Sequence, residues 1–398
     1  MVDKLRFVGM MMEYKLEGVF DLQMGKTPSR DRADYWNTND FKWISIADLT
    51  KSDKFISETK EYLSDVAVKE SGISLIPSGT VIMSFKLSIG KAAITTEPMY
   101  SNEAIMAFKD KHVIQLLPDY VYYMLTGKNW DECANKAVKG KTLNKATLSK
   151  IKVNIHDLPK QREIVAVLDK TKSLIDKRNR ELKQLDNLIK ARFVELFGDP
   201  VYNQKGWEKV VLSDEAEIKI GPFGSLLHRE DYITGGHALI NPSHIVEGQL
   251  APDNDLTISD DKYAELIAYQ LKEGDVVMGR RGEMGRCAVV DRPGLLCGTG
   301  SLLIRSKGNL SADYIQKIIS SPSFKRTIED MAVGQTMPNL NVPIVSNFRI
   351  IKPPKTIQDD YYRFVKQVDK SKVVVPSKIK NAIFAIMLSV SFGQITSI

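Results

Sequence analysis

The stretch that decides the fold is residues 158–200, LPKQREIVAVLDKTKSLIDKRNRELKQLDNLIKARFVELFGDP. Mostly apolar residues recur in it at alternating steps of four and three, which is the pattern of a coiled-coil seam along one face of a helix. Pro159 suits the first helical turn and Gly198-Asp199-Pro200 ends the helix, so about 40 residues form a rod of roughly 60 Å. One narrow apolar stripe needs a second helix, from later in this chain or from a partner subunit. The seam consists of Ile164, Leu168, Ile175, Leu182, Leu185, Ile189 and Leu196.

The composition is that of a globular protein with two or three domains, because 398 residues carry 43% hydrophobic and 26% charged side chains. A net charge of +7 favours a polyanionic partner. Cys133, Cys287 and Cys297 show no CxxC spacing, which argues against a disulfide framework or a zinc site. The apolar runs near both ends are too short for a signal peptide or a membrane span. We therefore expect a cytoplasmic protein that needs no membrane, metal or cofactor.

The chain repeats itself at a period of domain size. IPSGTVIMSFKLSIGKAAIT, before the long helix, matches LKEGDVVMGRRGEMGRCAVV after it. Four pairs of residues keep a separation of 195, a register that chance does not hold. The sequence therefore predicts a first domain over 1–157, the helix over 158–200, a second domain over 201–353 and a second helical region over 354–398. The four pairs are Gly79 and Gly274, Gly90 and Gly285, Asn144 and Asn339, and Pro159 and Pro354.

Each repeat has the pattern of a mixed α and β domain. Short β-rich runs such as TVIMSF and DVVMG are separated by Gly, Pro, Asn and Ser, and a helical segment follows each PDY or ADY. KIKVNIHDLP and SNFRIIKPP close the repeats as last strands that lead into the long helices. The predicted fold class is α+β, with two similar mixed α/β domains separated by long helices.

The motifs that resemble catalytic sites are incomplete. KGKT at 139–142 resembles a phosphate-binding loop, but Asn135 stands where that loop needs glycine, so a tight surface turn is favoured. NPSH at 241–244 is half of the tetrapeptide with which adenine methyltransferases hold their target, and GRRGEMG at 279–285 suits a surface hairpin. No set of nucleophile, base and orienting residue emerges, which favours binding over catalysis. The histidines of the second repeat, which lack a regular metal-ligand spacing, are His228, His237 and His244.

Basic residues gather in the paired Gly-rich turns, in segments where backbone amides and side chains can reach phosphates or base edges. Any one of them alone is better explained as a solvated residue on a loop. Their recurrence at equivalent places in both repeats favours nucleic-acid binding, and the arginines of the second repeat suit guanine in a major groove. These residues are Lys86, Lys91, Lys139, Lys141 and Lys145 in the first repeat and Arg280, Arg281 and Arg286 in the second.

The chain resembles the specificity subunit of a type I restriction-modification system. The resemblance rests on the opening MEYKLEGVFDLQMGKTPS, on the two Gly-rich turns, and above all on LPKQREIVAVLDK leading into a long helix that ends LFGDP, and it extends to about Asp369. It implies two target-recognition domains that each read one half of a split sequence in double-stranded DNA. It also implies that the two helices pair as an antiparallel coiled coil that spaces the half-sites. The chain would hold two methylation subunits and then restriction subunits, with no catalytic residues of its own.

The DNA contacts expected with this resemblance extend beyond the basic residues of the turns. The openings QMGKTPS and KIGPFGS match loosely between the repeats, and both are rich in Gly and Ser. The alternative from another class is a coiled-coil scaffold whose globular domains bind a partner other than DNA. The added candidate contacts are Lys26, Thr27, Ser29, Ser88, Thr142, Asn144, Ser225, His228, Arg229, Gln335, Thr336 and Asn339.

The second helix departs from the first towards its end. PPKTIQDDYYRFVKQVDK begins it with apolar residues in suitable places, but Pro376 follows soon after and breaks or kinks a helix interior. The tail SKIKNAIFAIMLSVSFGQITSI lacks the charged outer faces and the LFG ending of the first helix. Two explanations remain open. Either the tail is altered by a change of reading frame, or the helix restarts after a kink with a shorter seam of Ile379, Ile383, Ile386 and Val390.

Overall fold

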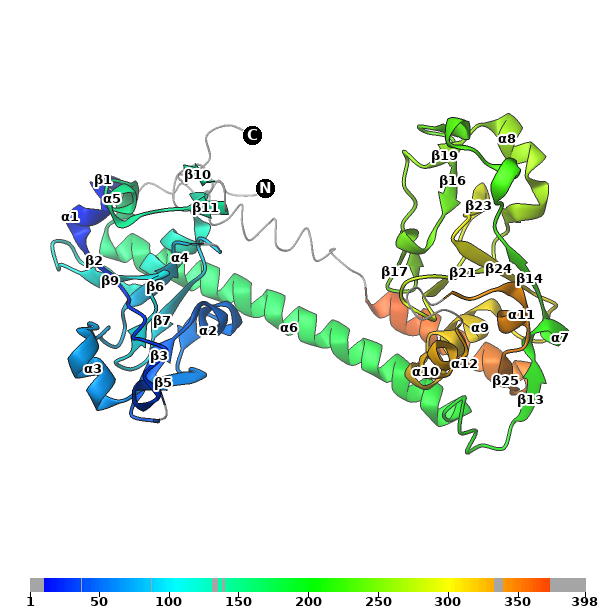
Figure 1. The fold of residues 1–398 in the computed structure, drawn as a ribbon, viewed down its shortest axis with the longest axis horizontal. Helices are drawn as coiled ribbons and strands as arrows, with labels where there is room; N and C mark the ends of the chain where they lie inside the picture. The colour runs from blue at the N-terminus through cyan, green and yellow to red at the C-terminus, as the bar shows by residue number, and fades with distance from the viewer. Residues whose placement is uncertain are drawn as a thin grey trace. The chain divides into compact units, whose positions relative to one another are not determined.

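The computed structural model describes residues 11–36, 38–86, 88–130, 135–137, 140–332 and 339–372. The chain divides into two compact units, residues 1–180 with 374–398 and residues 181–373, which we call unit 1 and unit 2. Figure 1 shows that each unit combines strands and helices, as the sequence predicts. No helix among the described residues is both long and apolar enough to traverse a lipid bilayer.

Unit 1 contains twelve described strands and short helices between them. The strands are β1 (Met11–Lys15), β2 (Phe20–Met24), β3 (Phe41–Ile44), β4 (Phe55–Ile56), β5 (Glu61–Leu63), β6 (Val81–Ser84), β7 (Ala92–Thr95), β8 (Tyr100–Ser101), β9 (Ile105–Asp110), β10 (Asn135–Ala137), β11 (Gly140–Thr142) and β12 (Lys152–His156). The helices before the long one are α1 (Leu16–Val19), the 3₁₀ turn η1 (Ala33–Tyr35), α2 (Ile46–Lys51), α3 (Asp65–Ser71), α4 (Pro118–Gly127) and α5 (Lys145–Ser149).

The main sheet of unit 1 has the strand order β2-β9-β6-β7-β4. β2, β9, β6 and β7 are antiparallel to their neighbours, whereas β4 runs parallel to β7. β6 and β7 are buried along their whole length, which explains their continuous apolar sequences VIMS and AAIT. A second sheet, β5-β3-β8, forms a separate lobe, and β1 pairs with β12, so the first and last strands of the domain lie side by side.

Unit 2 follows the same plan with longer insertions. Its strands are β13 (Glu208–Val211), β14 (Ala216–Ile220), β15 (Tyr232–Ile233), β16 (His237–Ile240), β17 (Ile245–Val246), β18 (Gln249–Leu250), β19 (Thr257–Ile258), β20 (Gln270–Leu271), β21 (Val276–Gly279), β22 (Cys287–Val289), β23 (Leu295–Cys297), β24 (Ser301–Ser306) and β25 (Arg349–Lys352). Its helices are α7 (Leu212–Glu215), η3 (Gly224–Leu226), η4 (Arg229–Asp231), η5 (Pro242–His244), α8 (Asp260–Glu265), η6 (Ile267–Tyr269), α9 (Ala312–Ile319), α10 (Pro322–Met331), α11 (Val342–Ser346) and α12 (Lys355–Ser371).

The sheets of unit 2 correspond to those of unit 1. The order β14-β24-β21-β22 matches β2-β9-β6-β7, and β13 pairs with β25 as β1 pairs with β12. A second lobe is built on the sheet β15-β19-β16-β23-β20. The predicted closing strands are therefore confirmed as β12 and β25, and GRRGEMG forms the turn between the antiparallel strands β21 and β22, as predicted.

One helix, α6 (Leu158–Phe197), begins in unit 1 and ends in unit 2. Pro159 is its second residue, and Gly198 takes a φ of +73° directly after it, which only glycine adopts without strain, so both predicted ends are confirmed. Ile164 and Leu168 are buried in the core of unit 1, and Ile189 is buried in the core of unit 2. The remaining predicted seam residues, Ile175, Leu182, Leu185 and Leu196, are half-buried.

The predicted seam misses two of the most important contacts of α6. Phe193 and Phe197 are buried and follow Ile189 at steps of four. An α-helix has 3.6 residues per turn, so a stripe drawn at an average of 3.5 drifts around the helix over successive turns. By the last turn of α6 the buried face has moved from Leu196 to Phe193 and Phe197.

The second helix that the seam requires is α12. The ring of Tyr361 lies 5.6 Å from the Phe193 ring and 5.5 Å from the Phe197 ring, measured between centroids. Further along α12, the Lys372 ammonium lies 2.9 Å from the Asp186 carboxylate. Because α12 advances while its partners on α6 recede, the two helices are antiparallel over this stretch. The tail from residue 373, including Pro376 and the proposed shorter seam, lies outside the described residues.

The register of the repeat changes partway through each unit. Gly79 and Gly274 both have positive φ angles, +73° and +85°, so the separation of 195 is confirmed there. Later in the chain it is wrong. The Asn144 side chain accepts from the Thr147 N–H at the start of α5, and the residue that does the same for α11 is Asn341, with the Ile344 N–H. These caps are 341 − 144 = 197 residues apart, so Asn339 is not the counterpart of Asn144.

The helix starts shift in the same way. α6 begins at Leu158 and α12 at Lys355, also 355 − 158 = 197 residues apart, so Pro159 and Pro354 are not equivalent. The cause lies between α9 and α11, where unit 2 contains the additional helix α10. An insertion of this kind moves every later match without disturbing the earlier ones.

Candidate nucleic-acid interface

Four loops of unit 1 meet at one end of its main sheet, and we call them loop cluster 1: residues 25–30, 85–91, 101–104 and 140–144. Main-chain hydrogen bonds hold them together. The Lys26 N–H donates to the Ser101 carbonyl (2.8 Å), the Phe85 N–H to the Ala104 carbonyl (3.0 Å), and the Leu143 N–H to the Phe85 carbonyl (3.0 Å). Residues more than 100 positions apart are thus brought to one place.

Four loops of unit 2 meet in the same way, and we call them loop cluster 2: residues 221–226, 280–286, 297–300 and 339–341. The Gly221 N–H donates to the Ser301 carbonyl (3.1 Å), the Arg280 N–H to the Gly300 carbonyl (3.0 Å), and the Leu340 N–H to the Arg280 carbonyl (2.9 Å). The same connections recur in both units, so the two clusters are equivalent structures.

A glycine lies at the tightest point of each cluster. A Cβ atom on Gly25 would lie 2.2 Å from the Asn102 carbonyl oxygen, and one on Gly221 would lie 2.0 Å from the Gly298 carbonyl oxygen. Neither φ angle is positive, so the requirement for glycine comes from close backbone approach and not from an unusual turn. The glycines of QMGKTPS and KIGPFGS are therefore explained by how closely the loops pack.

The side chains of loop cluster 1 have mixed roles. Thr27 donates its hydroxyl proton to the Glu103 carboxylate, and Lys86 is half-buried with its ammonium 5.3 Å from the Phe85 ring centroid. Burial raises the pKa of Glu103, but the Thr27 hydroxyl, a backbone N–H and the nearby charges of Lys86 and Arg30 outweigh it, so the pKa lies below its usual range. The cluster therefore holds a carboxylate among its cations.

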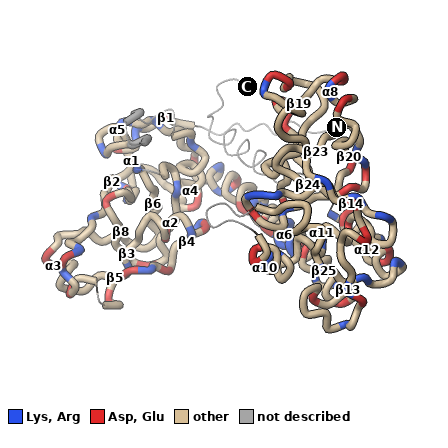
Figure 2. Tube along the Cα trace, turned by 45° about the vertical axis from the view of Figure 1, so that its right-hand side comes forward, with Lys and Arg blue, Asp and Glu red and all other residues tan. Residues whose placement is uncertain are grey.

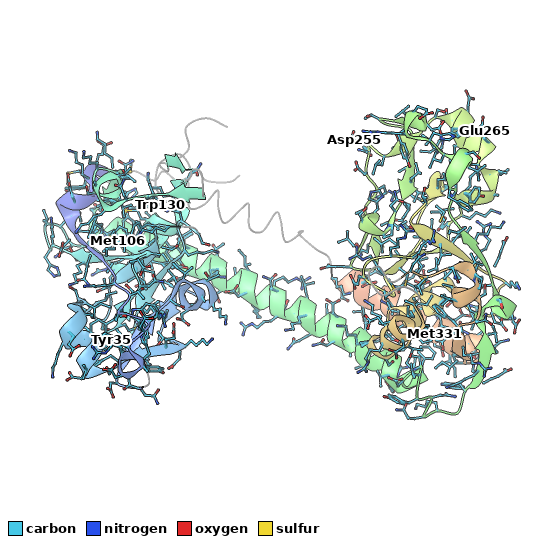
Figure 3. The ribbon with its side chains drawn as sticks, viewed as in Figure 1. Tyr35, Met106, Trp130, Asp255, Glu265 and Met331 are labelled. Atoms are coloured by element: carbon cyan, nitrogen blue, oxygen red, sulfur yellow. The ribbon has the colours of Figure 1, made fainter. Side chains whose placement is uncertain are left out.

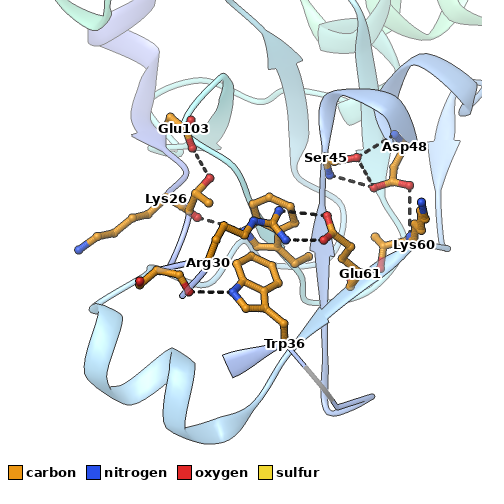
Figure 4. Close-up of polar contacts among 12 residues, drawn as sticks. Lys26, Arg30, Trp36, Ser45, Asp48, Lys60, Glu61 and Glu103 are labelled. Atoms are coloured by element: carbon orange, nitrogen blue, oxygen red, sulfur yellow. Dashed lines mark hydrogen bonds and ion pairs between the residues drawn. The ribbon is translucent and has the colours of Figure 1, made fainter. Parts of the chain in front are cut away.

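An arginine on the edge of loop cluster 1 is already occupied by protein contacts. The Arg30 guanidinium lies 3.7 Å from the Trp36 ring centroid and binds both oxygens of Glu61, one of them at 3.2 Å (Figure 4). The Trp36 indole N–H donates to the Ser29 carbonyl at 2.9 Å. These contacts fix the shape of the loop that carries Lys26 and Thr27.

The remaining candidates of loop cluster 1 differ in how free they are. Lys26 donates its ammonium to the Ser71 carbonyl, and the Ser88 carbonyl accepts from the Ser84 hydroxyl. Lys91 and Lys145 are exposed. Asn144 is used as the cap of α5. Lys141 and Thr142 belong to β11, but their side chains are not described, and Lys139 lies outside the described residues.

Loop cluster 2 surrounds a cleft of about 460 Å³ lined by Ile220, Phe223, Arg280, Arg281, Thr299 and Gly300. The Arg280 Nε donates to the Leu340 carbonyl at 3.2 Å, and burial together with the charge of Arg281 lowers the pKa of its guanidinium. Arg281 is exposed, and the described residues offer its guanidinium no hydrogen-bond or ion-pair partner. The Phe223 ring is 58% exposed, which is unusual for an aromatic side chain beside an arginine unless something else covers it.

The other candidates of unit 2 contribute less to this cleft. Arg286 binds Glu283 at 2.9 Å and the Pro242 carbonyl at 3.1 Å, so its guanidinium is engaged within the protein. Asn339 forms a β-bridge with Arg281, and its Oδ1 is buried without a hydrogen-bond partner among the described residues. Ser225 is exposed in η3 next to Phe223. His228 and Arg229 stand further along at η4, and Gln335 and Thr336 lie outside the described residues.

The motifs that resemble catalytic sites have structural positions. KGKT falls in the hairpin formed by β10 and β11, where Lys136 pairs with Lys141, as expected of a turn. His237 lies between the Gly294 carbonyl and Asp260, each 3.0 Å away, and buried His244 contacts the Leu239 carbonyl at 2.8 Å. Asn241 of NPSH accepts from the Gly300 N–H at 3.4 Å. Each of these groups supports the local fold.

Three positions at the clusters are equivalent but carry different side chains. The matched hydrogen bonds align Gly25 with Gly221, Phe85 with Arg280 and Ala104 with Gly300. Counting one or two residues from these anchors gives the corresponding sets, which are Thr27, Lys86 and Glu103 in unit 1 and Phe223, Arg281 and Thr299 in unit 2. The sequence stage missed Glu103, Phe223 and Thr299, although the exposed aromatic in GPFGS was a visible signal.

Charge alone does not mark the interface. Figure 2 shows basic and acidic residues interspersed along both units, without one continuous basic face. The candidate surface is therefore defined by the loop clusters, where unpaired cations, exposed backbone and an exposed aromatic occur together.

Comparisons with known proteins agree with this geometry. The family model described as the type I restriction modification DNA specificity domain matches residues 9–187 and again 204–384. The chain is 23% identical to the type I restriction enzyme MjaIX specificity subunit of Methanocaldococcus jannaschii, over 96% of this chain and 92% of that protein. It is 21% identical to the MjaVIII specificity subunit of the same organism, over 79% of this chain and 76% of that protein.

Solved structures show the same fold. The crystal structure of an S subunit of a type I restriction-modification system from M. genitalium matches with a TM-score of 0.56 at 12% identity, over 99% of both chains. A chain from a structural study of complex assembly and conformational transition of the type I system matches with a TM-score of 0.59 at 14% identity, over 97% of this chain and 98% of that one.

Proposed function

The chain belongs to the type I restriction modification DNA specificity family, and from this premise we propose that it reads a bipartite DNA sequence for a multisubunit restriction-modification complex. Each unit would read one half of the target with its loop cluster. The observation that carries the proposal is the recurrence of the same four-loop arrangement in both units, with different side chains at the three equivalent positions. A protein that reads two unlike half-sites needs this combination of a constant scaffold and variable contacts.

The cleft of unit 2 supports direct reading of bases. Arg281 is exposed and unpaired, and an arginine fork binds the O6 and N7 atoms of guanine in a bidentate manner. Phe223 forms an apolar wall beside it, which suits the methyl group of a neighbouring thymine. Thr299 completes the set with a hydroxyl that can donate or accept. We assign Arg281 to a base and Lys91 and Lys145 of unit 1 to phosphates.

Unit 1 would read a different half-site. Glu103 occupies the position of Thr299, and a carboxylate accepts a hydrogen bond from the N4 amino group of cytosine. Lys86 occupies the position of Arg281 and carries a point charge without a bidentate fork. The two half-sites should therefore differ in their base pairs, although the loops that read them share one backbone plan.

The chain would act with other subunits. Its relatives are specificity subunits of restriction enzymes, and we propose that two methylation subunits, and then restriction subunits, bind this chain and carry the catalytic activities. Leu174 and Leu188 on α6 are exposed apolar residues that suit such contacts. A DNA ligand also fits the cytoplasmic location expected from the sequence.

The proposed division of labour is by segment. Residues 1–157 and 201–353 would recognise DNA, and residues 158–200 and 354–398 would form the spacer. Contact between domains and spacer is direct, because α6 contributes buried residues to the core of each unit. The length of α6 should therefore set the number of unspecified base pairs between the half-sites.

Insertion of residues into α6 tests this function. Four helix-forming residues placed between Arg180 and Leu185 add about 6 Å and slightly more than one full turn. We expect methylation at sites with unchanged half-site bases and a gap longer by one or two base pairs, since duplex DNA rises about 3.4 Å per pair. The measurement is the map of methylated sites in cells that express the variant together with its methylation subunits.

The control is an insertion of equal length elsewhere. Four residues added to the surface turn at 291–294 of unit 2 leave α6 unchanged and should leave the gap unchanged. Loss of sequence-specific methylation in the wild-type complex would remove the proposed function altogether. An unchanged gap in the α6 variant would remove only the role of the helix.

A further inference from the structure

A buried glutamine joins each long helix to the domain before it. In unit 1 this residue is Gln161, the fourth residue of α6, which has no exposed surface. Its Oε1 accepts from the Leu117 N–H at 3.0 Å, and its Nε2 donates to the Gln115 and His156 carbonyls, both at 2.9 Å. One side chain thus connects the first turn of the helix to the last strand and to the loop before α4.

Unit 2 repeats this joint with its own residues. Gln358 is the fourth residue of α12 and is 1% exposed. Its Oε1 accepts from the Ser311 N–H at 2.9 Å, and its Nε2 donates to the Asn309 carbonyl at 3.1 Å and to the Pro353 carbonyl at 2.9 Å. All three partners are again main-chain groups, in the last strand's exit and in the loop before α9.

The chemistry of the joint requires an amide at this length. A buried N–H and two buried carbonyls must find partners, and a glutamine side chain supplies one acceptor and two donors. Rotation of the helix about its first turn would break these bonds and leave polar groups buried without partners. The joint therefore resists changes in the angle between the helix and the domain.

A second contact beside each glutamine supports the same geometry. The hydroxyl of buried Tyr120 in α4 lies 2.8 Å from Nδ1 of His156, and the hydroxyl of buried Tyr314 in α9 donates to the Ile351 carbonyl at 3.0 Å. Helix α4 or α9, the last strand and the first turn of the long helix thus form one connected assembly in each unit.

We propose that Gln161 and Gln358 are positioning residues that fix each recognition domain on its own spacer helix, so that spacing specificity is set at these two joints as well as by helix length. This inference rests on the proposed function, because spacing has a meaning only for a bipartite target. Helix length would set the mean gap, and the joints would set how narrowly one gap is selected.

The test replaces Gln161 with methionine, which keeps the length of the side chain and removes its hydrogen bonds. The full chain is expressed with its methylation subunits, and methylation is compared at target sites whose gaps differ by one base pair. We expect unchanged half-site bases and a preference for the cognate gap that falls about fivefold or more, because even one buried hydrogen bond corresponds to roughly that factor. Gln358→Met should act in the same direction.

The matched control is Gln184→Met, an exposed glutamine on the same helix, which should leave the preference unchanged. Faster amide exchange of the Leu117 N–H in Gln161→Met would show that the intended bond has been lost. Where Gln161→Met fails to assemble, Gln161→Glu keeps the acceptor for the Leu117 N–H and provides a milder variant.

Two outcomes would overturn the proposal. One is a Gln161→Met complex that assembles, exchanges the Leu117 N–H faster, and still selects one gap as narrowly as the wild type. The other is failure of every glutamine variant in both units to assemble, which would make these residues determinants of stability and not of spacing. Absence of any bipartite methylation in the wild type would instead count against the proposed function.

Discussion

Loop cluster 1 and loop cluster 2 have the same backbone connections and different side chains. Phe85 and Lys86 occupy the hairpin positions of Arg280 and Arg281, and Glu103 occupies the position of Thr299. Main-chain hydrogen bonds do not depend on side-chain identity, so the three positions can change without disturbing the loops. The comparison teaches that this fold separates the residues that build the interface from those that read the DNA.

The largest effect should come from breaking the shared backbone plan. Gly25→Ala and Gly221→Ala each place a methyl group within 2.2 Å of a carbonyl oxygen, so backbone must move. We expect a loss of roughly 3 kcal/mol in the stability of the affected unit, the upper end of the usual range for overpacking. Chemical denaturation with probes in each unit measures this loss.

The matched control for the glycine variants is Gly18→Ala. No heavy atom lies within 4 Å of a Cβ at Gly18, which is in helix α1, so this change should be neutral or slightly stabilising. A destabilisation by Gly18→Ala equal to that by Gly25→Ala would show that close packing is not the cause.

A smaller effect should separate the two reading positions. Arg281→Ala should lose about 2 kcal/mol on the cognate site and little on random DNA, as expected for a lost bidentate contact with a base. Lys86→Ala should weaken binding to both and reduce the slope of log affinity against log salt by roughly one. Titration of cognate and random duplexes at several salt concentrations measures both.

The controls for these variants lie at the far ends of the same strands. Arg292 follows β22 at the end away from the hairpin, and Lys109 lies near the far end of β9. Arg292→Ala and Lys109→Ala remove equal charge and should change affinity less. Equal losses on cognate and random DNA for Arg281→Ala would assign that residue to phosphate contact.

The smallest effect should be a pH dependence confined to unit 1. Burial, and secondarily the charge of Lys160, lowers the pKa of His156, while Asp157 opposes them. The folded unit therefore holds this histidine neutral, and its contribution to stability is present above the unfolded pKa of about 6.5 and is lost as the pH falls below it. In unit 2 Tyr314 contacts a main-chain carbonyl that does not titrate.

Amide exchange at about pH 7.5 and 5.5 checks this prediction, with the two units followed separately. Unit 1 should lose more protection than unit 2 at the lower pH, and His156→Gln should reduce the difference. An undiminished difference in the variant would assign the pH response to other groups.

Much of the fold could be predicted from local sequence. The bounds of α6, the closing strands β12 and β25, and the hairpin at GRRGEMG depend on periodicity, proline and glycine within a few residues. The antiparallel partner of α6 was implied by family resemblance and is seen in α12. The drift of the seam to Phe193 and Phe197 was missed because a coiled-coil period was assumed where a single helix packs on a domain core.

The candidate interface could be predicted only in part. Basic residues within one hairpin were found from the sequence, but the company of Glu103 or Phe223 depends on loops that meet through tertiary hydrogen bonds. Gln358 was missed because Pro-x-Gln in the first helix becomes PKTIQ in the second, and the conserved quantity is distance from the helix start. Asn339 was misassigned because an inserted helix shifted the register.

The pairing of first and last strands gives each domain a property of inheritance. Met11 lies opposite His156 in β1 and β12, and Glu208 lies opposite Lys352 in β13 and β25, so each domain begins and ends at one place. A segment whose ends meet can be exchanged by recombination as a complete cassette, because the chain on either side needs no new path. A single crossover on each side of such a segment would replace one half of the recognised DNA sequence and keep the other, so new specificities can arise in one step.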